Sequence, residues 1–230
     1  MDGAASQGFI RSRGMKFPKN PDILRPFVRR LLRQDIYEHK ESEAIRRMAQ
    51  DGDRVLEIGG GIGYMSTLVA TKKAVQEVHT FEANPRLIPY IREVHAANNV
   101  TNVTVTNALL ADSDGPPVDF HIRKNFLGSS MDRDSDPNTI IATEKVPQKN
   151  IHAVLNTLRP DLLICDIEGA EAHLLPLCDF SGLRTAVVEL HPQWIGQSGV
   201  QAVFDTFHRA GMTYFPKASA AKVVTFRRGW

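Results

Sequence analysis

Residues 54–63 read Arg54-Val55-Leu56-Glu57-Ile58-Gly59-Gly60-Gly61-Ile62-Gly63, and this stretch decides the fold. Its first half is a short apolar strand that ends in an acid, and its second half is a glycine-rich turn before a helical pattern. Glycines let a backbone approach a ligand closely because no Cβ atoms stand in the way. Open parallel sheets bind ligands at the carboxyl ends of their strands. The stretch therefore predicts a nucleotide-like ligand above a parallel sheet.

Strand and helix patterns alternate along the rest of the chain. Buried helical faces are indicated where apolar residues recur three and four positions apart, as they do after residues 64, 86 and 199. Strands separated by helices imply a mostly parallel sheet with helices on both faces, and two closing strands can pair only as an antiparallel hairpin. The expected strands are 54–58, 78–82, 103–110, 120–122, 139–146, 162–165, 185–188, 212–215 and 223–226.

The chain is expected to divide near residue 50. Residues 1–50 are predicted to form an N-terminal arm, up to about residue 20, followed by two helical pieces. Residues 51–230 are predicted to form the ligand-binding domain. Within it, residues 112–150 are the least regular, and together with the arm we expect them to shape the acceptor pocket.

Composition indicates an ordinary folded protein. Of 230 residues, 42% are hydrophobic and 23% are charged, and no apolar run approaches the length of a membrane span. The two cysteines, Cys165 and Cys178, fit neither a disulfide framework nor a zinc site, so we expect a reducing, cytoplasmic location. Eight Lys and Arg residues lie between Arg11 and Arg33 against one acid, Asp22. This segment is either a solvated arm or a binding surface for an anionic partner.

The glycine turn does not fit the common phosphate-binding fingerprints. A dinucleotide site needs Gly-x-Gly-x-x-Gly, but the third glycine would be Tyr64 if counted from Gly59 and Ser66 if counted from Gly61. No Gly-Lys-Ser/Thr follows, so a P-loop is excluded. An acid at the strand end would repel a diphosphate, whereas it suits a cationic sulfonium. The pattern favours S-adenosylmethionine and the sheet of a class I (Rossmann-like) methyltransferase.

Contacts with this cofactor can be assigned along the sequence. Glu57 would hold the amino group of the methionine moiety, directly or through water, and Glu82 would accept hydrogen bonds from both ribose hydroxyls. Asn107 and Ala108 follow the third strand, where adenine is expected, and Tyr64 and Tyr37 would approach the methionine end. The full predicted set is Glu57, Gly59, Gly60, Gly61, Gly63, Tyr64, Glu82, Ala83, Asn107, Ala108 and Asp166.

Three further segments, Phe81-Glu82-Ala83-Asn84-Pro85, Asp166-Ile167-Glu168-Gly169-Ala170-Glu171 and Val188-Glu189-Leu190-His191-Pro192, occur in order. With the short segment Tyr37-Glu38 before them, they resemble the FkbM-type methyltransferase family over roughly residues 36–191. The chain departs from the family pattern at Ile167, at Glu57 and at Gly60-Gly61. The resemblance implies S-adenosylmethionine-dependent O-methylation of a sugar, a glycolipid or a polyketide-type natural product.

Acids that end the fourth and fifth strands point to the chemistry. An alcohol acceptor must be aligned with the methyl carbon and must lose its proton. We expect Asp166 or His191 to be the general base, with Glu168 and Glu189 positioning the acceptor. Glu189 and His191 are two positions apart and so should point to the same side. Glu171 is expected only to decorate the first helical turn, where the helix dipole favours an acid.

A divalent metal is the main mechanistic rival. Asp166, Glu168, Glu189 and His191 have suitable ligand atoms, but their spacing is not diagnostic, and no metal ligand is predicted. The acids at 132, 134 and 136 resemble half of a calcium loop, yet Pro137 stands where that loop needs glycine. We interpret them as solvated loop acids.

Two other functions stay open. One is a nucleic-acid methyltransferase that uses the basic arm, although the Asn/Asp-Pro-Pro-Tyr/Phe motif of amino-methylating enzymes is missing from the fourth strand. The other is a non-catalytic module that binds S-adenosylmethionine. The main expectation is a small-molecule or carbohydrate acceptor and no membrane span. Nucleic acid is not the partner we expect, and the chain is compatible with a homodimer.

Overall fold

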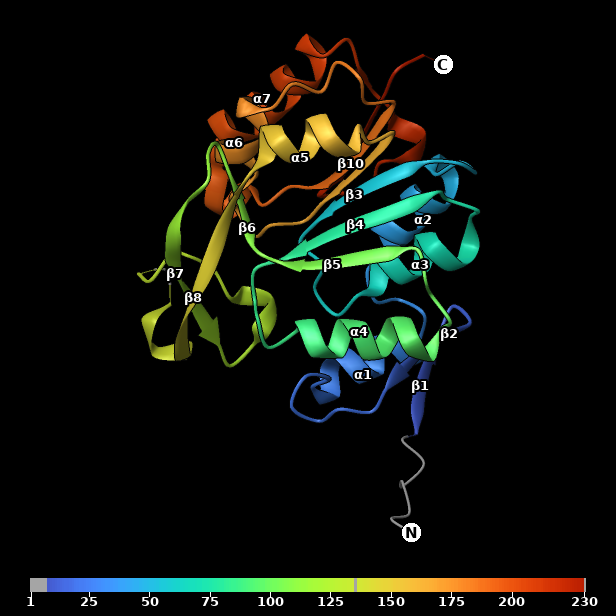
Figure 1. The fold of residues 1–230 in the computed structure, drawn as a ribbon, viewed down its shortest axis with the longest axis vertical. Coiled ribbons are helices and arrows are strands. Elements are labelled where there is room, and N and C mark those ends of the chain that lie inside the picture. The colour runs from blue at the N-terminus through green and yellow to red at the C-terminus, as the bar shows by residue number, and fades with distance from the viewer. Residues whose placement is uncertain (1–7, 135, 230) are drawn as a thin grey trace.

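The computed structural model describes residues 8–134 and 136–229. A seven-stranded sheet forms its centre, in the spatial order β11-β12-β10-β9-β3-β4-β5 (Figure 1). The strands are β3 (Arg54–Ile58), β4 (Glu77–Glu82), β5 (Val103–Asn107), β9 (Leu162–Cys165), β10 (Thr185–Glu189), β11 (Thr213–Tyr214) and β12 (Val223–Arg227).

Strand directions match the prediction. β5, β4, β3, β9 and β10 are parallel neighbours, whereas β12 runs antiparallel between β10 and β11. From β3 the chain continues to β4 on one side and returns later to β9 on the other. Such a topological switch point opens a crevice at the carboxyl ends of the two central strands. The glycine turn therefore lies where a parallel sheet binds its ligand.

Helices cover both faces of the sheet because its central strands are apolar on both sides (Figure 1). In β3, Val55 belongs to one buried core, and Leu56 and Ile58 belong to the other. The helices are α1 (Pro26–Arg33), α2 (His39–Met48), α3 (Tyr64–Lys72), α4 (Ile88–Ala97), α5 (Ile151–Leu158), α6 (Glu171–Leu174) and α7 (Pro192–Arg209). Short 3-10 turns are η1 (Phe126–Gly128), η2 (Pro137–Thr139), η3 (Leu175–Leu177) and η4 (Pro216–Ala218).

The N-terminal region differs from the predicted arm. β1 (Phe9–Ser12) and β2 (Met15–Pro18) form an antiparallel pair, and residues 1–7 lie outside the described part. Phe17 is fully buried and stacks on Tyr64 with ring centroids 5.3 Å apart. The prediction missed this pair because the apolar alternation is only a few residues long and is interrupted by charges. The two predicted helical pieces are confirmed as α1 and α2.

The irregular middle of the chain forms a second sheet of three strands, β6 (Leu109–Ala111), β7 (Gly115–Arg123) and β8 (Ile140–Asn150). The single strand predicted at 103–110 is therefore split, because the chain leaves β5 at Asn107 and joins β8 instead. Phe120, Ile122 and Val146 pack against Ala83, just beyond the end of β4. This packing places the β7–β8 hairpin beside the carboxyl edge of the main sheet, as Figure 1 shows.

Candidate active site

The glycine turn packs tightly on one side and is open on the other. A Cβ atom at Gly59, whose φ is +92°, would lie 1.7 Å from the carbonyl oxygen of Asp166, so only glycine fits between β3 and the end of β9. At Gly61, whose φ is +52°, a Cβ atom would meet nothing within 4 Å. The open side at Gly61 leaves room for a ligand above the turn.

Glu82 ends β4 directly beneath this turn. Its Oε2 accepts a hydrogen bond from the Gly61 backbone N–H at 2.7 Å, and its Oε1 accepts one from Asn84 N–H at 2.7 Å. Burial raises the pKa of this carboxyl to about 7, although its backbone hydrogen bonds oppose the rise. The side chain is thus fixed by the loop it supports, at the position where we predicted contact with the ribose hydroxyls.

Glu57 is more deeply buried than expected of a ligand contact. It is 1% exposed, and its Oε1 accepts a hydrogen bond from Ser66 N–H in the first turn of α3 at 3.0 Å. Burial raises its pKa to about 7 as well. The carboxylate stabilises the start of α3, so its predicted contact with an amino group remains a proposal in the water-mediated form.

The side chains of three other predicted cofactor residues are buried or hydrogen-bonded within the protein. Tyr64 is 1% exposed and its hydroxyl lies 3.2 Å from Ser12 Oγ, so we no longer assign its side chain to the cofactor. Asn107 Nδ2 donates to the carbonyl oxygens of Glu82 at 2.8 Å and Ala83 at 2.9 Å. Ala108 is buried. Only backbone atoms of Asn107 and Ala108 remain as proposed neighbours of adenine.

The four predicted catalytic side chains meet around the His191 ring. Nε2 of His191 lies 3.3 Å from Glu168 Oε2, 3.7 Å from Asp166 Oδ1 and 4.0 Å from Glu189 Oε1. The ring is 3% exposed. β9 and β10 deliver these groups because they are parallel neighbours whose carboxyl ends coincide. We call Asp166, Glu168, Glu171, Glu189 and His191 the carboxylate–histidine cluster.

Glu171 corrects the prediction that it merely decorates a helix. It does lie in the first turn of α6, but it is fully buried, and its Oε1 is 2.6 Å from His191 Nδ1. The same oxygen accepts a hydrogen bond from Gly169 N–H at 3.1 Å. Sequence could not reveal this because the partners are 20 residues apart and meet only when β10 lies beside β9. Glu171 sets the orientation of the imidazole.

Electrostatics in the cluster favour shared protons. Burial, followed by the charges of Glu189 and Glu168, raises the pKa of Asp166 well above its ordinary value. Burial by itself would lower the pKa of His191, but the hydrogen bond and charge of Glu171, with the charges of Glu168 and Asp166, raise it to about 9. The imidazole is therefore held as a cation among carboxylates when nothing else is bound.

Residues before the sheet extend the cluster. Burial, with the charge of Asp166 as the next cause, raises the pKa of Glu38 well above its ordinary value, and Glu41 raises the pKa of Glu189 after burial does. Tyr37 is 3% exposed and is placed near Asp166. Glu38 has a left-handed backbone, with φ of 43°, at the start of α2. Sequence reasoning noted only the Tyr37-Glu38 pair and missed Glu41 altogether, for lack of any periodic signal.

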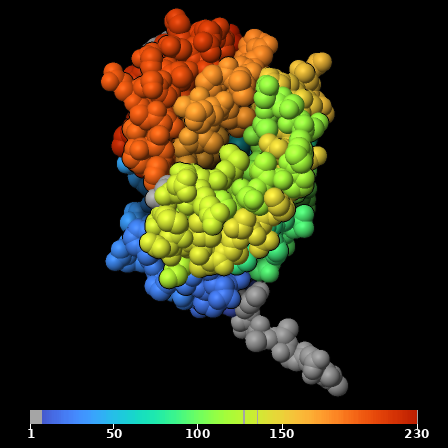
Figure 2. Space-filling view, turned by 90° about the vertical axis from the view of Figure 1, so that its left-hand side faces the viewer, coloured from blue at the N-terminus to red at the C-terminus, as the bar shows by residue number. Residues whose placement is uncertain are grey.

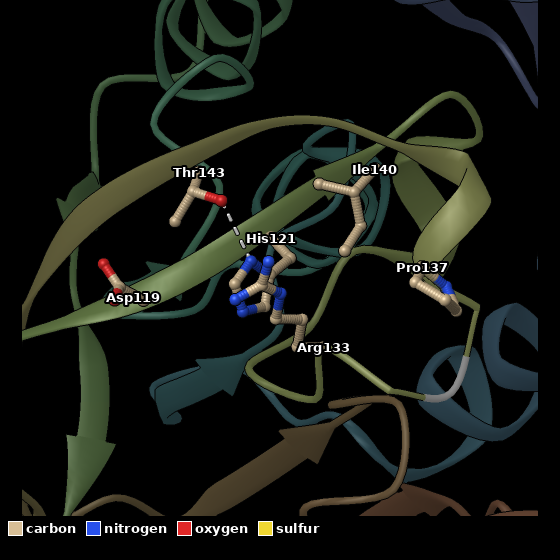
Figure 3. Close-up of a pocket in the computed structure, with 6 residues that line it drawn as sticks. All are labelled: Asp119, His121, Arg133, Pro137, Ile140 and Thr143. Atoms are coloured by element: carbon tan, nitrogen blue, oxygen red, sulfur yellow. Dashed lines mark hydrogen bonds between the residues drawn. The ribbon is translucent and has the colours of Figure 1, made fainter.

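A separate pocket of about 380 Å³ lies on the β7–β8 hairpin (Figure 3). Its floor includes His121, whose Nδ1 is 3.0 Å from Thr143 Oγ1. The residues that line it are Asp119, His121, Arg133, Pro137, Ile140 and Thr143. None of them belongs to the glycine turn or to the carboxylate–histidine cluster, so this pocket is not where the predicted chemistry is placed.

Different groups line the two sides of the crevice at the carboxyl ends of the central strands. The glycine turn and Glu82 line the β3–β4 side, and the carboxylate–histidine cluster lines the β9–β10 side. Figure 2 shows a hollow between the β7–β8 hairpin, in yellow-green, and the orange segments that follow β9. Acids on both sides suit a cationic sulfonium, and the open turn at Gly61 suits a nucleoside. The residues present therefore fit S-adenosylmethionine.

Solved structures with a similar fold include three methyltransferases. Trm5b from Pyrococcus abyssi matches with a TM-score of 0.53 and 15% identity, over 99% of this chain and 57% of that chain. Precorrin-6y C5,15-methyltransferase from Geobacter metallireducens matches at 0.50 and 12%, over 84% and 88% of the two chains. Ribosomal protein L11 methylase from Lactobacillus delbrueckii matches at 0.50 and 13%, over 85% and 80%. This chain has the class I methyltransferase fold, a Rossmann-like arrangement with a mostly parallel central sheet.

The comparison with protein families matches only part of the chain. Residues 35–120 match the family model of the TRM5/TYW2 methyltransferase domain, and no curated protein sequence matches the chain. The predicted FkbM-type family is therefore wrong, and so is the O-methylation inferred from it. Acids at the ends of the strands are expected in any methyltransferase of this fold, so they did not distinguish one family from another. The chain spans 57% of the length of Trm5b.

No helix among the described residues has the length and apolar character needed to cross a membrane.

Proposed function

We propose that this chain is an S-adenosylmethionine-dependent methyltransferase that acts on RNA and transfers the methyl group to a base. The family whose model matches residues 35–120 methylates RNA bases in tRNA, and the matched region contains the glycine turn and Glu82. This proposal replaces the expectation of a sugar, glycolipid or natural-product acceptor, and the expectation that nucleic acid is not a partner.

The observation that carries the proposal is the basic surface of α1. The exposed residues Arg25, Arg30 and Arg33 lie on or next to this helix, and no acid occurs between residues 23 and 34. Phe27 is 56% exposed, with the Arg30 guanidinium 5.4 Å from its ring centroid. Guanidinium groups pair with phosphates, and an exposed aromatic ring offers a stacking surface for a base.

The position of α1 relates this surface to the site. At its beginning, Arg25 Nη2 donates a hydrogen bond to the Lys124 carbonyl oxygen at 3.3 Å, in the loop after β7. Just beyond its end, Tyr37 and Glu38 lie beside Asp166. The blue N-terminal segment and the yellow-green hairpin are contiguous in Figure 2. RNA bound along α1 would therefore lie close to the crevice that holds the cofactor.

Methyl transfer to a base nitrogen requires a proton acceptor. The nitrogen forms a bond to the methyl carbon, the carbon–sulfur bond breaks with its electron pair going to sulfur, and the nitrogen's proton must leave. Asp166 is the proposed acceptor of that proton, since its raised pKa makes it a better base than an ordinary carboxylate. Glu168 and Glu189 are proposed to position the base. The cofactor supplies the activated methyl group.

The test measures methyl transfer and RNA binding with the full chain. Transfer of a radioactive methyl group from S-adenosylmethionine to unmodified RNA should exceed transfer to sugars and glycolipids. The triple variant Arg25→Ala/Arg30→Ala/Arg33→Ala should bind RNA more weakly. For single-stranded RNA, each lost phosphate contact should reduce the slope of log affinity against log salt by about 0.7.

Arg209→Ala is the matched control. Arg209 is also exposed, but it is the last residue of α7, which runs back from the carboxyl edge of the sheet to the opposite edge. Its removal should leave RNA affinity and the salt slope unchanged. RNA binding that falls equally in the control and the triple variant would contradict the role of α1, and methyl transfer only to small molecules would reject an RNA acceptor.

We also propose a cytoplasmic location. Cys165 and Cys178 are both free, and burial raises the pKa of each thiol, most strongly for Cys165. Cysteines that stay reduced and unpaired are typical of a reducing compartment. Mass spectrometry of the protein from cell extract, alkylated without reduction, should find both cysteines unpaired.

A further inference from the structure

The His191 imidazole is arranged as metal-ligating histidines are. Its Nδ1 is tied to Glu171, a fully buried carboxylate, at 2.6 Å. Its Nε2 points into a group of carboxylates, of which Glu168 Oε2 is the nearest at 3.3 Å. A carboxylate on one ring nitrogen fixes the tautomer and leaves the lone pair of the other nitrogen for a metal ion.

The atoms around Nε2 are close enough to share one ion. One ligand atom each from Asp166, Glu189 and His191 lies within 4.8 Å of the other two. Metal–ligand bonds of about 2.1 Å put neighbouring ligands about 3 Å apart and opposite ligands about 4.2 Å apart. The Nε2 distances of 3.7 Å to Asp166 and 4.0 Å to Glu189 fall within that span. Small side-chain movements would complete the site.

Two observations distinguish this place from an ordinary group of surface acids. The His191 side chain is 97% buried, since only 3% of it is exposed, yet its Nε2 is aimed into the cluster. Oδ1 of Asp166 is a buried atom without a hydrogen-bond partner. A buried imidazole nitrogen and a buried carboxylate oxygen that face each other without a shared donor need a proton or a cation between them.

The net charge of the cluster also indicates that a cation would be stabilised there. Asp166, Glu168, Glu171 and Glu189 are four carboxylates, and the cations against them are His191 and Lys222, whose Nζ is 3.9 Å from Glu189. When these six groups are ionised they carry two net negative charges, and the carboxyl groups of Glu38 and Glu41 lie beside them, so a divalent ion would offset an excess of negative charge. An ion would also reduce the repulsion between this acidic crevice and the phosphates of an RNA acceptor.

We propose that Asp166, Glu189 and His191 bind a divalent first-row transition-metal ion, with Glu171 holding the histidine and Glu168 available as a further ligand. One imidazole with two or three carboxylates suits Mn²⁺ or Zn²⁺ better than Ca²⁺. The proposal concerns metal binding alone and does not depend on the identity of the acceptor.

The experiment titrates the metal-free full chain with MnCl₂ and follows free Mn²⁺ by electron paramagnetic resonance, in parallel with ZnCl₂ by calorimetry. One ion should bind per chain. Asp166→Asn and Glu189→Gln should each weaken binding at least about ten-fold, and Glu171→Gln about ten- to a hundred-fold. Pulsed resonance of the bound Mn²⁺ should detect one histidine nitrogen, which the variant His191→Gln should remove.

Asp134→Asn is the matched control. It removes an exposed acid from the loop after β7 and should leave Mn²⁺ affinity unchanged. Thermal unfolding of each variant establishes that it is folded. Asp166→Asn should keep its fold, because it relieves repulsion inside the cluster. No stoichiometric binding at 1 mM of either ion, or equal binding by Asp166→Asn and the wild type, would overturn the proposal. Either result leaves the RNA experiment unaffected.

Discussion

Glu82→Gln tests how burial acts on the carboxylate beneath the glycine turn. The substitution keeps the shape of the side chain and removes its titration. Glu82 is 7% exposed, and burial raises its pKa from 4.5 to about 7. The carboxyl group thus holds its proton more tightly in the folded chain than in the unfolded chain. The stability that it contributes is fully present below pH 4.5 and is lost as the pH rises to about 7.

The magnitude follows from linkage. At about 1.4 kcal/mol for each pH unit, the rise from 4.5 to about 7 corresponds to about 3 kcal/mol of unfolding free energy. Glu57, whose pKa burial also raises to about 7, contributes a similar loss over the same range. The wild type should therefore lose stability more steeply between pH 5 and pH 8 than Glu82→Gln does, by up to about 3 kcal/mol.

Urea unfolding followed by far-UV circular dichroism at four pH values between 5 and 8 measures this difference. The comparison uses the change with pH, so a constant cost of replacing a carboxylate by an amide cancels. Glu93→Gln, which removes an exposed acid from α4, is the control and should reproduce the wild-type slope. Equal slopes for Glu82→Gln and the wild type would refute the reasoning.

The pKa of Glu82 should also set how the affinity for S-adenosylmethionine depends on pH. We propose that Glu82 accepts hydrogen bonds from the two ribose hydroxyls, which it does best as a carboxylate, so affinity for S-adenosylmethionine should rise with pH up to about 7 and then level off. Calorimetry in two buffers of different ionisation enthalpy should show proton release on binding near pH 6. A pH-independent affinity with no proton release would contradict this role.

Two further substitutions test the close packing and the histidine partner. Gly59→Ala should lose about 3 kcal/mol or more of stability, because its Cβ atom would meet the Asp166 carbonyl oxygen at 1.7 Å. The control Gly52→Ala, at φ +84° in open space, should lose only about 1 kcal/mol. Equal losses in thermal unfolding would contradict the steric argument. Glu171→Gln should lower kcat about ten- to a hundred-fold and leave the KM for S-adenosylmethionine unchanged, because the buried partner that orients the His191 ring is lost while the glycine turn and Glu82 are untouched. A change in KM alone would contradict a positioning role.

Local patterns were enough to predict most of the regular structure. The predicted strands at 54–58 and 162–165 have the same bounds as β3 and β9, because short apolar runs between turn residues have one plausible state in a parallel sheet. The β1–β2 pair was not predicted because its short alternation of apolar residues is interrupted by charges, whereas β9 is an unbroken apolar run. The break after Asn107 also escaped prediction, since the choice of a new partner strand is made by tertiary packing.

For the site, sequence identified which groups end the strands but not what they contact. Asp166, Glu168, Glu189 and His191 were predicted to lie together, and they do, because parallel strands bring their carboxyl ends to one edge. Tyr64 was placed wrongly because an aromatic residue after a glycine turn can face either the ligand or the core. The helical register of α3 turned it toward Phe17.

By itself, then, the stretch from Arg54 to Gly63 predicted a parallel sheet with a glycine turn at the end of a strand, since glycines permit the tight turn that leads from a strand into a helix. The acids at the strand ends led us to predict a cationic ligand. Only the tertiary structure decided that Glu171 holds the His191 ring and that residues from α2 join the cluster. These contacts join segments far apart in the chain, and their energies depend on burial, which no local pattern contains.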